Sequence, residues 1–198
     1  MTKRHYSSPV REKAAAEKRE RTLAAAAEVL ASGDLTAFSL DAVAQRAGVT
    51  RLTVYNQFGS RSGLLEAVFD DRAMRGGLGR IASAMAMADA QAALRRIIEI
   101  FCEFWESNRA LGPLHAAISL DPEFAAALEQ RNERRRRLLT TLVTRLAGEA
   151  PLARRRDAVD MMFVMTGQPA YASLRKGRST VEACRLITHG CEAALRAL

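Results

Sequence analysis

Apolar residues recur at helical spacing along most of the chain, and this pattern predicts an all-α protein. Near the N-terminus, an Ala-rich helix is expected at residues 17–31, with Leu23, Ala26, Ala27 and Leu30 on one face. Two short helices are expected at residues 40–47 and 51–58, and a longer one begins at residue 61. No stretch shows the strict alternation that would predict a strand.

The helical pattern continues to the C-terminus. A junction is expected around residues 76–90, where Gly76, Gly77 and Gly79 loosen the chain. Beyond it, helices are expected at residues 90–107, 109–119, 121–147, 152–174 and 179–197, about nine helices in the whole chain. The predicted organisation is a flexible basic arm at 1–15, an N-terminal domain at 16–76 and a C-terminal helical domain at 77–198.

Residues 39–58 have the spacing of a helix-turn-helix motif. Ser39 and Thr50 are good N-caps for the two short helices, and Gly48 supplies the sharp turn between them. A helix-turn-helix places its second helix in the major groove of DNA. The motif therefore predicts a nucleic-acid-binding surface on residues 51–58.

The charge of the chain agrees with an anionic partner. The formal net charge is +8, and residues 1–61 contain ten basic against six acidic side chains. Basic excess favours encounter with nucleic acid, although a merely basic protein would show it too. No apolar run approaches the roughly 20 residues of a membrane span, and no signal segment opens the chain, so a cytoplasmic location without membrane contact is expected.

The three cysteines predict reduced, buried thiols. Cys102, Cys184 and Cys191 form no Cys-x-x-Cys pair, and no other ligand spacing is evident, so neither a metal nor a cofactor is expected. Cys184 and Cys191 share a helical face, with His189 nearby. Metal ligation or redox sensing there remains the alternative to simple packing.

The N-terminal domain resembles that of the TetR family of bacterial transcriptional regulators. The resemblance rests on Gly48-Val49-Thr50, on Thr53-Val54-Tyr55, and on Phe58, Ser60, Arg61 and Leu64. The run Phe-Ser-Leu-Asp-x-Val-Ala that begins at Phe38 agrees with it. The sequence departs from the family at Leu52 and Gln57, and Arg61 stands where the family usually has Lys.

The chemistry of the second helix suggests how it would read DNA. Arg can bind guanine, Asn and Gln can pair with adenine, and Leu can contact a thymine methyl. The resemblance implies phosphate contacts for Thr53 and Tyr55. The candidate DNA-binding residues are Arg21, Thr22, Thr50, Arg51, Leu52, Thr53, Tyr55, Asn56, Gln57 and Arg61. The alternative is that these residues form only the solvated face of a short amphipathic helix.

The resemblance implies that the C-terminal domain binds a small molecule and dimerises. Candidate ligand-binding residues are Phe101, Trp105, Leu111, Leu114, His115, Ile118, Arg131, Met161, Met165, Gln168 and Tyr171, all equally compatible with an ordinary core. Arg131 and Arg135 fall on an apolar stripe. Either their charged ends extend to solvent at the edge of the stripe, or they select an anionic effector. Candidate dimer-interface residues are Met162, Thr166, Ala170, Leu174, Ala183, Leu186, Ile187, Gly190 and Ala194.

The predicted function is a homodimeric, ligand-responsive regulator that binds a near-palindromic operator in double-stranded DNA, most simply as a repressor. An activator or a regulator controlled by a partner protein would use the same fold. An enzyme would have only His115 or His189 with Cys184 or Cys191 as nucleophile candidates, and no catalytic motif supports it. A protein-binding helical module without DNA is the remaining alternative.

Overall fold

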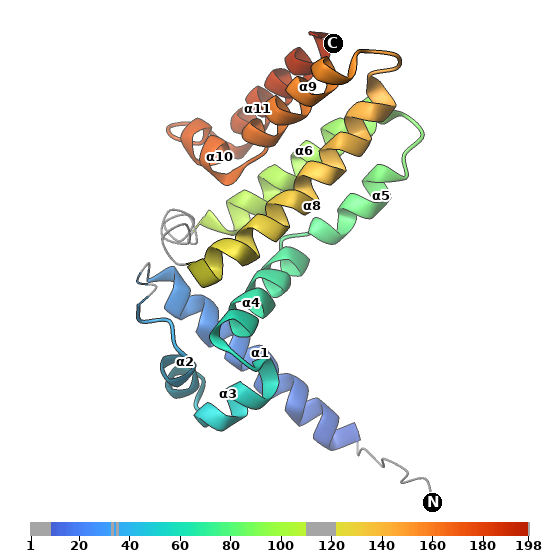
Figure 1. Cartoon of the computed structure of the whole chain (residues 1–198). Coiled ribbons are helices and arrows are strands. Elements are labelled where there is room, and N and C mark those ends of the chain that lie inside the picture. Colours follow the sequence, from blue (N-terminus) through green and yellow to red (C-terminus); the bar gives the residue numbers. More distant parts are fainter. Residues whose placement is uncertain (1–8, 33, 35, 110–121, 198) are drawn as a thin grey trace, which may run out of the picture. The chain divides into compact units, whose positions relative to one another are not determined.

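The computed structural model describes residues 9–32, 34, 36–109 and 122–197 (Figure 1). These residues form ten α-helices and one 3₁₀ turn, and no strand occurs among them, which confirms the predicted all-α fold. The chain divides into two compact units, one up to Asp71 and one from Arg72. The division falls inside a helix, whereas the sequence placed the boundary after residue 76.

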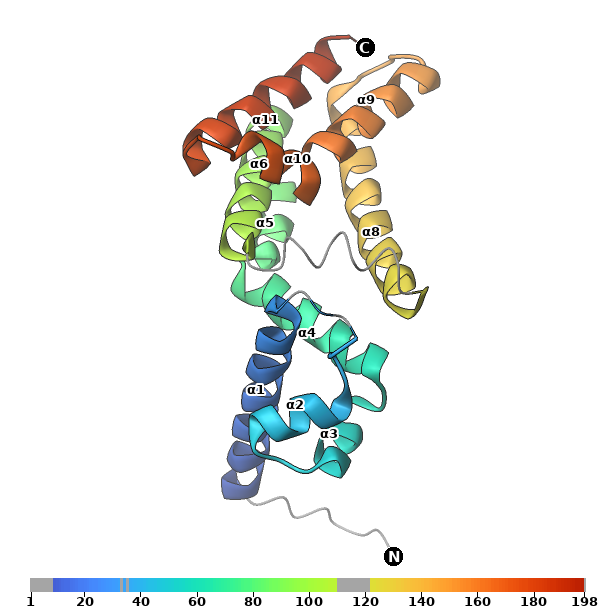
Figure 2. The same ribbon diagram turned by 90° about the vertical axis from the view of Figure 1, so that its left-hand side faces the viewer.

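The first unit contains three complete helices and most of a fourth. They are α1 (Pro9–Ala31), α2 (Leu40–Ala47), α3 (Arg51–Phe58) and α4 (Arg61–Arg75). Helix α2 packs against both α1 and α3, and Figure 2 shows the two short helices beside α1. The core of the first unit is made of apolar side chains, namely Leu23, Ala26, Ala27, Leu30, Phe38, Val43, Ala44, Val54, Leu64, Leu65 and Val68.

Local signals set the two short helices. The Ser39 side chain accepts a hydrogen bond from the backbone N–H of Ala42, and Thr50 accepts one from Thr53. Between the helices, Gly48 has a φ of 64°, the left-handed conformation that glycine adopts at least cost. Ser39, Gly48 and Thr50, the residues from which the helix-turn-helix was predicted, therefore take the capping and turn roles expected of them.

The predicted flexible arm was wrong for residues 9–15, because α1 already begins at Pro9. Proline suits the first turn of a helix, where a backbone N–H has no partner, and the alanines at 14–16 are strong helix formers. Residues 1–8 of that arm lie outside the described residues.

The predicted junction at residues 76–90 also contains more structure than expected. After Gly77, with a φ of 80°, a 3₁₀ turn η1 (Leu78–Arg80) leads into α5 (Ile81–Met85). Arg145, from a later helix, donates hydrogen bonds of 2.8 and 2.6 Å to the carbonyls of Met85 and Met87. These bonds satisfy carbonyl groups at the end of α5 that the helix leaves without partners.

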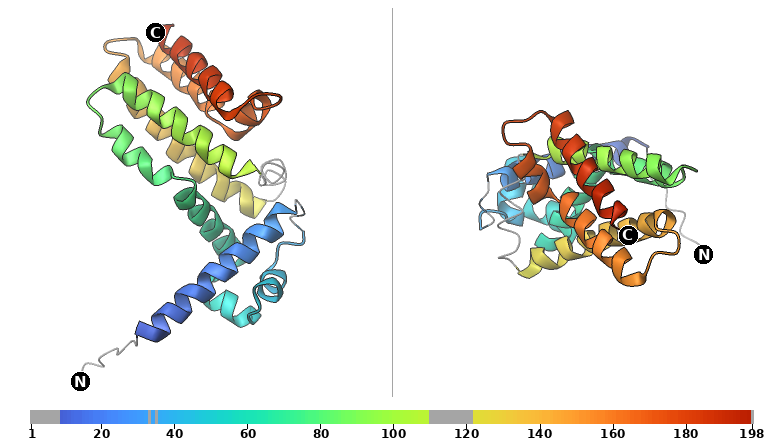
Figure 3. Two further views of the ribbon diagram at one scale, coloured as in Figure 1. Left: turned by 180° about the vertical axis from the view of Figure 1, so that it is seen from behind. Right: turned by 90° about the horizontal axis from the view of Figure 1, so that it is seen from above.

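The second unit is built around α6 (Ala90–Ser107). It packs against α5, α8 (Pro122–Leu146) and α11 (Thr180–Arg196), while α9 (Leu152–Met165) packs against α8 and α11 (Figure 3). The bounds of α6 and α8 agree closely with the predicted helices. The helix predicted at 109–119 lies largely outside the described residues.

The helix predicted at 152–174 is two helices, α9 and α10 (Gln168–Leu174). Gly167 takes an extended conformation between them, and Pro169 has no N–H to continue the helical hydrogen bonding. The carbonyl of Thr166 at the break accepts 2.9 Å hydrogen bonds from Trp105 Nε1 and from Arg135 Nη1. The single helix was therefore a wrong prediction from a sequence that contained the signal for the break.

Several residues predicted for the dimer interface are instead enclosed by their own chain. Met162, Thr166, Ala183 and Ile187 are at most 1% exposed. Gly190 faces Met165, since a Cβ added there would lie 2.5 Å from Met165 Cε. These five positions hold the second unit together and cannot present side chains to another copy.

No helix in the described part of the chain has the length and apolar character needed to cross a membrane.

Candidate nucleic-acid interface

Helix α3 has one buried face and one exposed face. Val54 is fully buried in the core of the first unit, whereas Leu52 is 64% and Tyr55 is 51% exposed. Arg51 and Asn56 are exposed as well. The outward face thus combines a cation, an amide, a phenol and an aliphatic side chain, a set that can contact base edges and phosphates.

The N-terminus of α3 is organised by a pair of threonines. The Thr50 hydroxyl lies 2.9 Å from the Thr53 hydroxyl and accepts a 3.2 Å hydrogen bond from the Thr53 backbone N–H. The partial positive charge of a helix N-terminus favours an anion, and both hydroxyls lie at this end. The arrangement can accept a DNA phosphate.

Arg51 makes an ion pair that a DNA contact could replace. Its Nε lies 3.2 Å from Asp41 Oδ2, with 62% of the Arg51 side chain and 72% of the Asp41 side chain exposed. Ion pairs this exposed contribute little to stability. The guanidinium is therefore held in place only weakly.

Three predicted contact residues are placed differently from expectation. Thr22 is fully buried, and its hydroxyl donates a 2.8 Å hydrogen bond to the Lys18 carbonyl one turn earlier, so its side chain cannot reach DNA. Gln57 is half-buried, with its Oε1 enclosed and without a partner among the described residues. Arg61 donates a 2.8 Å hydrogen bond from Nε to the Phe38 carbonyl, which ties the start of α4 to the loop before α2.

Arg19 is a positioning residue that the sequence did not reveal. Its guanidinium lies over the Phe58 ring, 4.6 Å from the centroid, and its Nη1 donates a 3.3 Å hydrogen bond to the Gln57 carbonyl. A cation at a helix C-terminus and over an aromatic face is favourable on both counts. Nothing local marks this role, since the partners lie 38 and 39 positions further along the chain.

In the second unit, the predicted ligand-binding residues divide by exposure. Phe101 and Tyr171 are buried, while Trp105, Arg131, Met165 and Gln168 are half-buried. Met161 is 55% exposed, so it cannot line an enclosed cavity of this chain. Leu111, Leu114, His115 and Ile118 lie outside the described residues.

Tyr171 belongs to a polar network rather than to a purely apolar wall. Its hydroxyl donates a 2.6 Å hydrogen bond to Glu106 Oε2, which also accepts a 3.1 Å hydrogen bond from Arg175 Nε. The Tyr171 hydroxyl and, after it, Arg175 lower the pKa of Glu106. Burial, followed by the Glu106 hydrogen bond, raises the pKa of Tyr171 to about 12.

Arg135 is a half-buried cation with neutral partners. Besides the Thr166 carbonyl, it contacts the Asn132 Oδ1 at 3.4 Å and the face of Phe163, whose centroid lies 4.2 Å from its Cζ. Its Nε is enclosed and has no partner among the described residues. Burial lowers the pKa of Arg135 to about 10, because the charged form is poorly solvated there.

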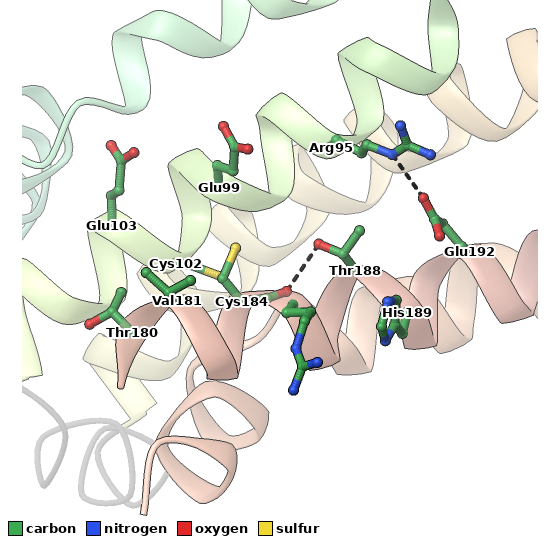
Figure 4. Close-up of a pocket in the computed structure, with 11 residues that line it drawn as sticks. Arg95, Glu99, Cys102, Glu103, Thr180, Val181, Cys184, Thr188, His189 and Glu192 are labelled. Atoms are coloured by element: carbon green, nitrogen blue, oxygen red, sulfur yellow. Dashed lines mark hydrogen bonds and ion pairs between the residues drawn. The ribbon is translucent and has the colours of Figure 1, made fainter. Parts of the chain in front are cut away.

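A separate hollow of about 540 Å³ lies between α6 and α11 (Figure 4). Its lining includes Arg95, Glu99, Cys102 and Glu103 from α6 and Val181, Cys184 and His189 from α11. It contains none of the ligand-binding residues predicted from the sequence. The sequence did not show that charged side chains and two thiols line one hollow, because α6 and α11 lie far apart in the chain.

Comparison with known proteins agrees with the geometry of the first unit. Residues 23–68 match the profile of bacterial regulatory proteins of the tetR family. This range includes α2, α3 and the buried face of α4. No curated protein matches the chain.

Solved structures with the same fold cover nearly the whole chain. A TetR-like transcriptional regulator from Rhodococcus sp. RHA1 has a TM-score of 0.70 at 18% identity, covering 90% of this chain and 96% of its own. The fatty acid degradation regulator FadR from Bacillus halodurans has a TM-score of 0.63 at 16% identity, covering 91% and 99%. The TetR-like regulator LfrR from Mycobacterium smegmatis, solved with proflavine, has a TM-score of 0.54 at 24% identity, covering 89% and 95%.

The helix-turn-helix with its outward-facing α3, the profile match and the shared fold agree with one another. Residues 23–68 match the tetR family of bacterial regulatory proteins, and the chain shares the fold of solved TetR-like transcriptional regulators.

Proposed function

We propose that this protein is a homodimeric repressor that leaves a near-palindromic operator when a small molecule binds its C-terminal domain. The exposed face of α3 carries this proposal. Leu52 and Tyr55 are more than half exposed on a helix whose other face is fixed in the core by Val54. A short, rigidly held helix with such a face is suited to the major groove.

Different side chains of that face are suited to contact bases and phosphates. Arg51 and Asn56 can read base edges, and Leu52 can contact a thymine methyl. Phosphates can be bound by Thr50 and Thr53 at the N-terminus of α3 and by Tyr55 on its exposed face. Arg21 is exposed on α1 and can contact the flanking backbone. Arg61 Nε already donates a hydrogen bond to the Phe38 carbonyl, so a phosphate contact by Arg61 would use another nitrogen of the same guanidinium.

Dimerisation would use the outer surfaces of the last helices. Met161 and Val164 are 55% and 62% exposed on α9. Ala170, Leu174, Leu186 and Ala194 are only partly buried in the single chain, so a second copy could cover them. A two-fold axis would place two α3 helices about 34–36 Å apart, one turn of DNA.

The proposed effector site lies in the second unit, near Phe101, Trp105 and Arg135. LfrR, a protein of the same fold, was solved with proflavine, which supports a small-molecule site in this architecture. The half-buried charge of Arg135, with its enclosed Nε, favours an effector with an anionic group. A screen of carboxylates against their neutral amides, read by thermal shift, tests this preference, and Arg135→Met should remove it.

Regulation requires coupling between effector and DNA. If the effector weakens operator binding, then by linkage the operator must weaken the effector by the same factor. Footprinting of the DNA next to the gene, followed by titration of a carboxylate from the screen with and without that DNA, tests the proposal. Equal affinities in the two titrations would contradict release by effector and would favour an activator or a partner-controlled regulator.

A further inference from the structure

Two cysteines that are far apart in the chain line the same hollow between α6 and α11. Cys102 comes from α6 and Cys184 from α11, and both line the hollow of about 540 Å³ (Figure 4). Cys102 is 2% exposed, whereas Cys184 is half-buried. The helices pack directly on each other, with Ala183 and Ile187 of α11 buried in the shared core.

The two thiols interact, and their roles differ. The interaction between the two thiols is the largest cause that lowers the pKa of Cys184 and raises that of Cys102. Thr188 also lowers the pKa of Cys184, while burial, Glu99 and Glu103 oppose the shift. Burial raises the pKa of the third cysteine, Cys191, to about 12. Cys184 is therefore the thiol that most readily becomes the reactive thiolate.

We propose that Cys102 and Cys184 form a two-thiol modification site that is oxidised by a hydroperoxide entering the hollow. The Cys184 thiolate attacks the O–O bond, so that an S–O bond forms, the O–O bond breaks, and the leaving oxygen takes a proton to become water or an alcohol. Cys184 is thereby oxidised by two electrons to a sulfenic acid. The Cys102 sulfur then attacks the Cys184 sulfur, an S–S bond forms, and the S–O bond breaks as water leaves with the Cys102 proton.

The position of the site explains why the pair should react in this order. Cys184 is half-buried, whereas Cys102 is buried, and both line the hollow, so the more accessible Cys184 meets the oxidant first. Cys102 is shielded from bulk solvent, which suits a resolving thiol. The product would be a covalent link between α6 and α11, formed by two cysteines that are 82 positions apart in the sequence. The proposal does not depend on DNA binding.

The full-length protein, reduced and then treated with a small excess of hydrogen peroxide, tests this site. Intact mass should fall by two hydrogen masses per chain, peptide mapping should find Cys102 linked to Cys184, and dithiothreitol should reverse the change. In Cys102→Ser, a sulfenic acid should persist at Cys184 and be trapped by dimedone. In Cys184→Ser, the rate of peroxide consumption should fall at least tenfold.

Cys191→Ala is the matched control, because it removes a third thiol of the same helix that does not line the hollow. It should form the Cys102–Cys184 link at the wild-type rate, with circular dichroism verifying that each variant is folded. Dimedone labelling of the wild-type protein in place of a link, a link that involves Cys191, or a disulfide between two copies would each overturn the proposal.

Discussion

The guanidinium of Arg19 lies over the ring of Phe58, with its Cζ 4.6 Å from the ring centroid, and donates a hydrogen bond to the neighbouring Gln57 carbonyl. Helix α3 ends at Phe58, so this contact fastens the C-terminal end of α3 to α1. The N-terminal end is held by Thr50, and the middle is anchored by Val54. The orientation of the exposed face therefore depends on residues that would never contact DNA.

Replacing Arg19 by Met should destabilise the first unit and weaken DNA binding. The cation–π contact and the favourable position at a helix C-terminus together contribute about 1 kcal/mol. Urea unfolding and fluorescence anisotropy with labelled operator would measure the two effects. Lys18→Met removes the same charge from an exposed neighbouring position and is the control. Equal effects of both variants would mean that only net charge matters.

The two faces of α3 should respond oppositely to truncation. Leu52→Ala should change the free energy of unfolding by less than about 0.5 kcal/mol, because the side chain is 64% exposed, yet it should alter operator preference. Val54→Ala should cost about 2 kcal/mol, because it opens a cavity in the core. Thermal unfolding and a binding-site selection would separate these outcomes. A Leu52→Ala variant with unchanged preference would remove Leu52 from the reading surface.

The turn between α2 and α3 should depend on glycine at one position. Gly48 has a φ of 64°, so Gly48→Ala should cost about 1 kcal/mol even though nothing lies within 4 Å of an added Cβ. Gly79 also has open space around it but no positive φ, so Gly79→Ala is the matched control. Chemical denaturation of both variants would test the prediction. A Gly48→Ala variant as stable as wild type would show that the turn tolerates a side chain.

Glu106 should give the second unit a specific pH dependence. Hydrogen bonds from Tyr171 and Arg175 lower its pKa in the folded state below the ordinary 4.5. The stabilisation is therefore fully present above about pH 4.5 and is lost as the pH falls through the lowered value. Glu106→Gln should lower the free energy of unfolding by about 1 kcal/mol at pH 7. This is less than a fully buried charged hydrogen bond contributes, because the Glu106 side chain is 30% exposed.

Unfolding of wild type and Glu106→Gln across pH 3 to 7 would test this linkage. The difference between the two proteins should shrink toward acid pH. A difference that is constant with pH would show that the carboxylate contributes through shape rather than through charge.

Features encoded by neighbouring residues could be predicted from the sequence. Ser39, Gly48 and Thr50 define the ends of α2 and α3 through bonds to residues within four positions. The bounds of α6 follow from its apolar stripe and the Asp89 cap. The signals for the break between α9 and α10, Gly167 and Pro169, are also local. They were missed because the apolar pattern continues across them and predicted one helix.

Features that depend on distant partners could not be predicted. The burial of Thr22, the contact of Arg19 with Phe58, and the meeting of Cys102 with Cys184 all require the three-dimensional packing of helices. The dimer residues Met162 and Ile187 illustrate the same limit, because periodicity identifies an apolar face but not whether the same chain or a second copy covers it.

DNA binding by the exposed face of α3 can be measured directly. Fluorescence anisotropy would compare wild type with a Leu52→Ala/Tyr55→Ala/Asn56→Ala variant on the footprinted duplex and on a scrambled one, over a series of salt concentrations. We predict that wild type prefers the footprinted duplex by about 10³-fold or more, with affinity falling linearly in log salt, and that the variant loses this preference while remaining folded. A variant that retains the preference, or a wild type that binds both duplexes equally, would contradict the account.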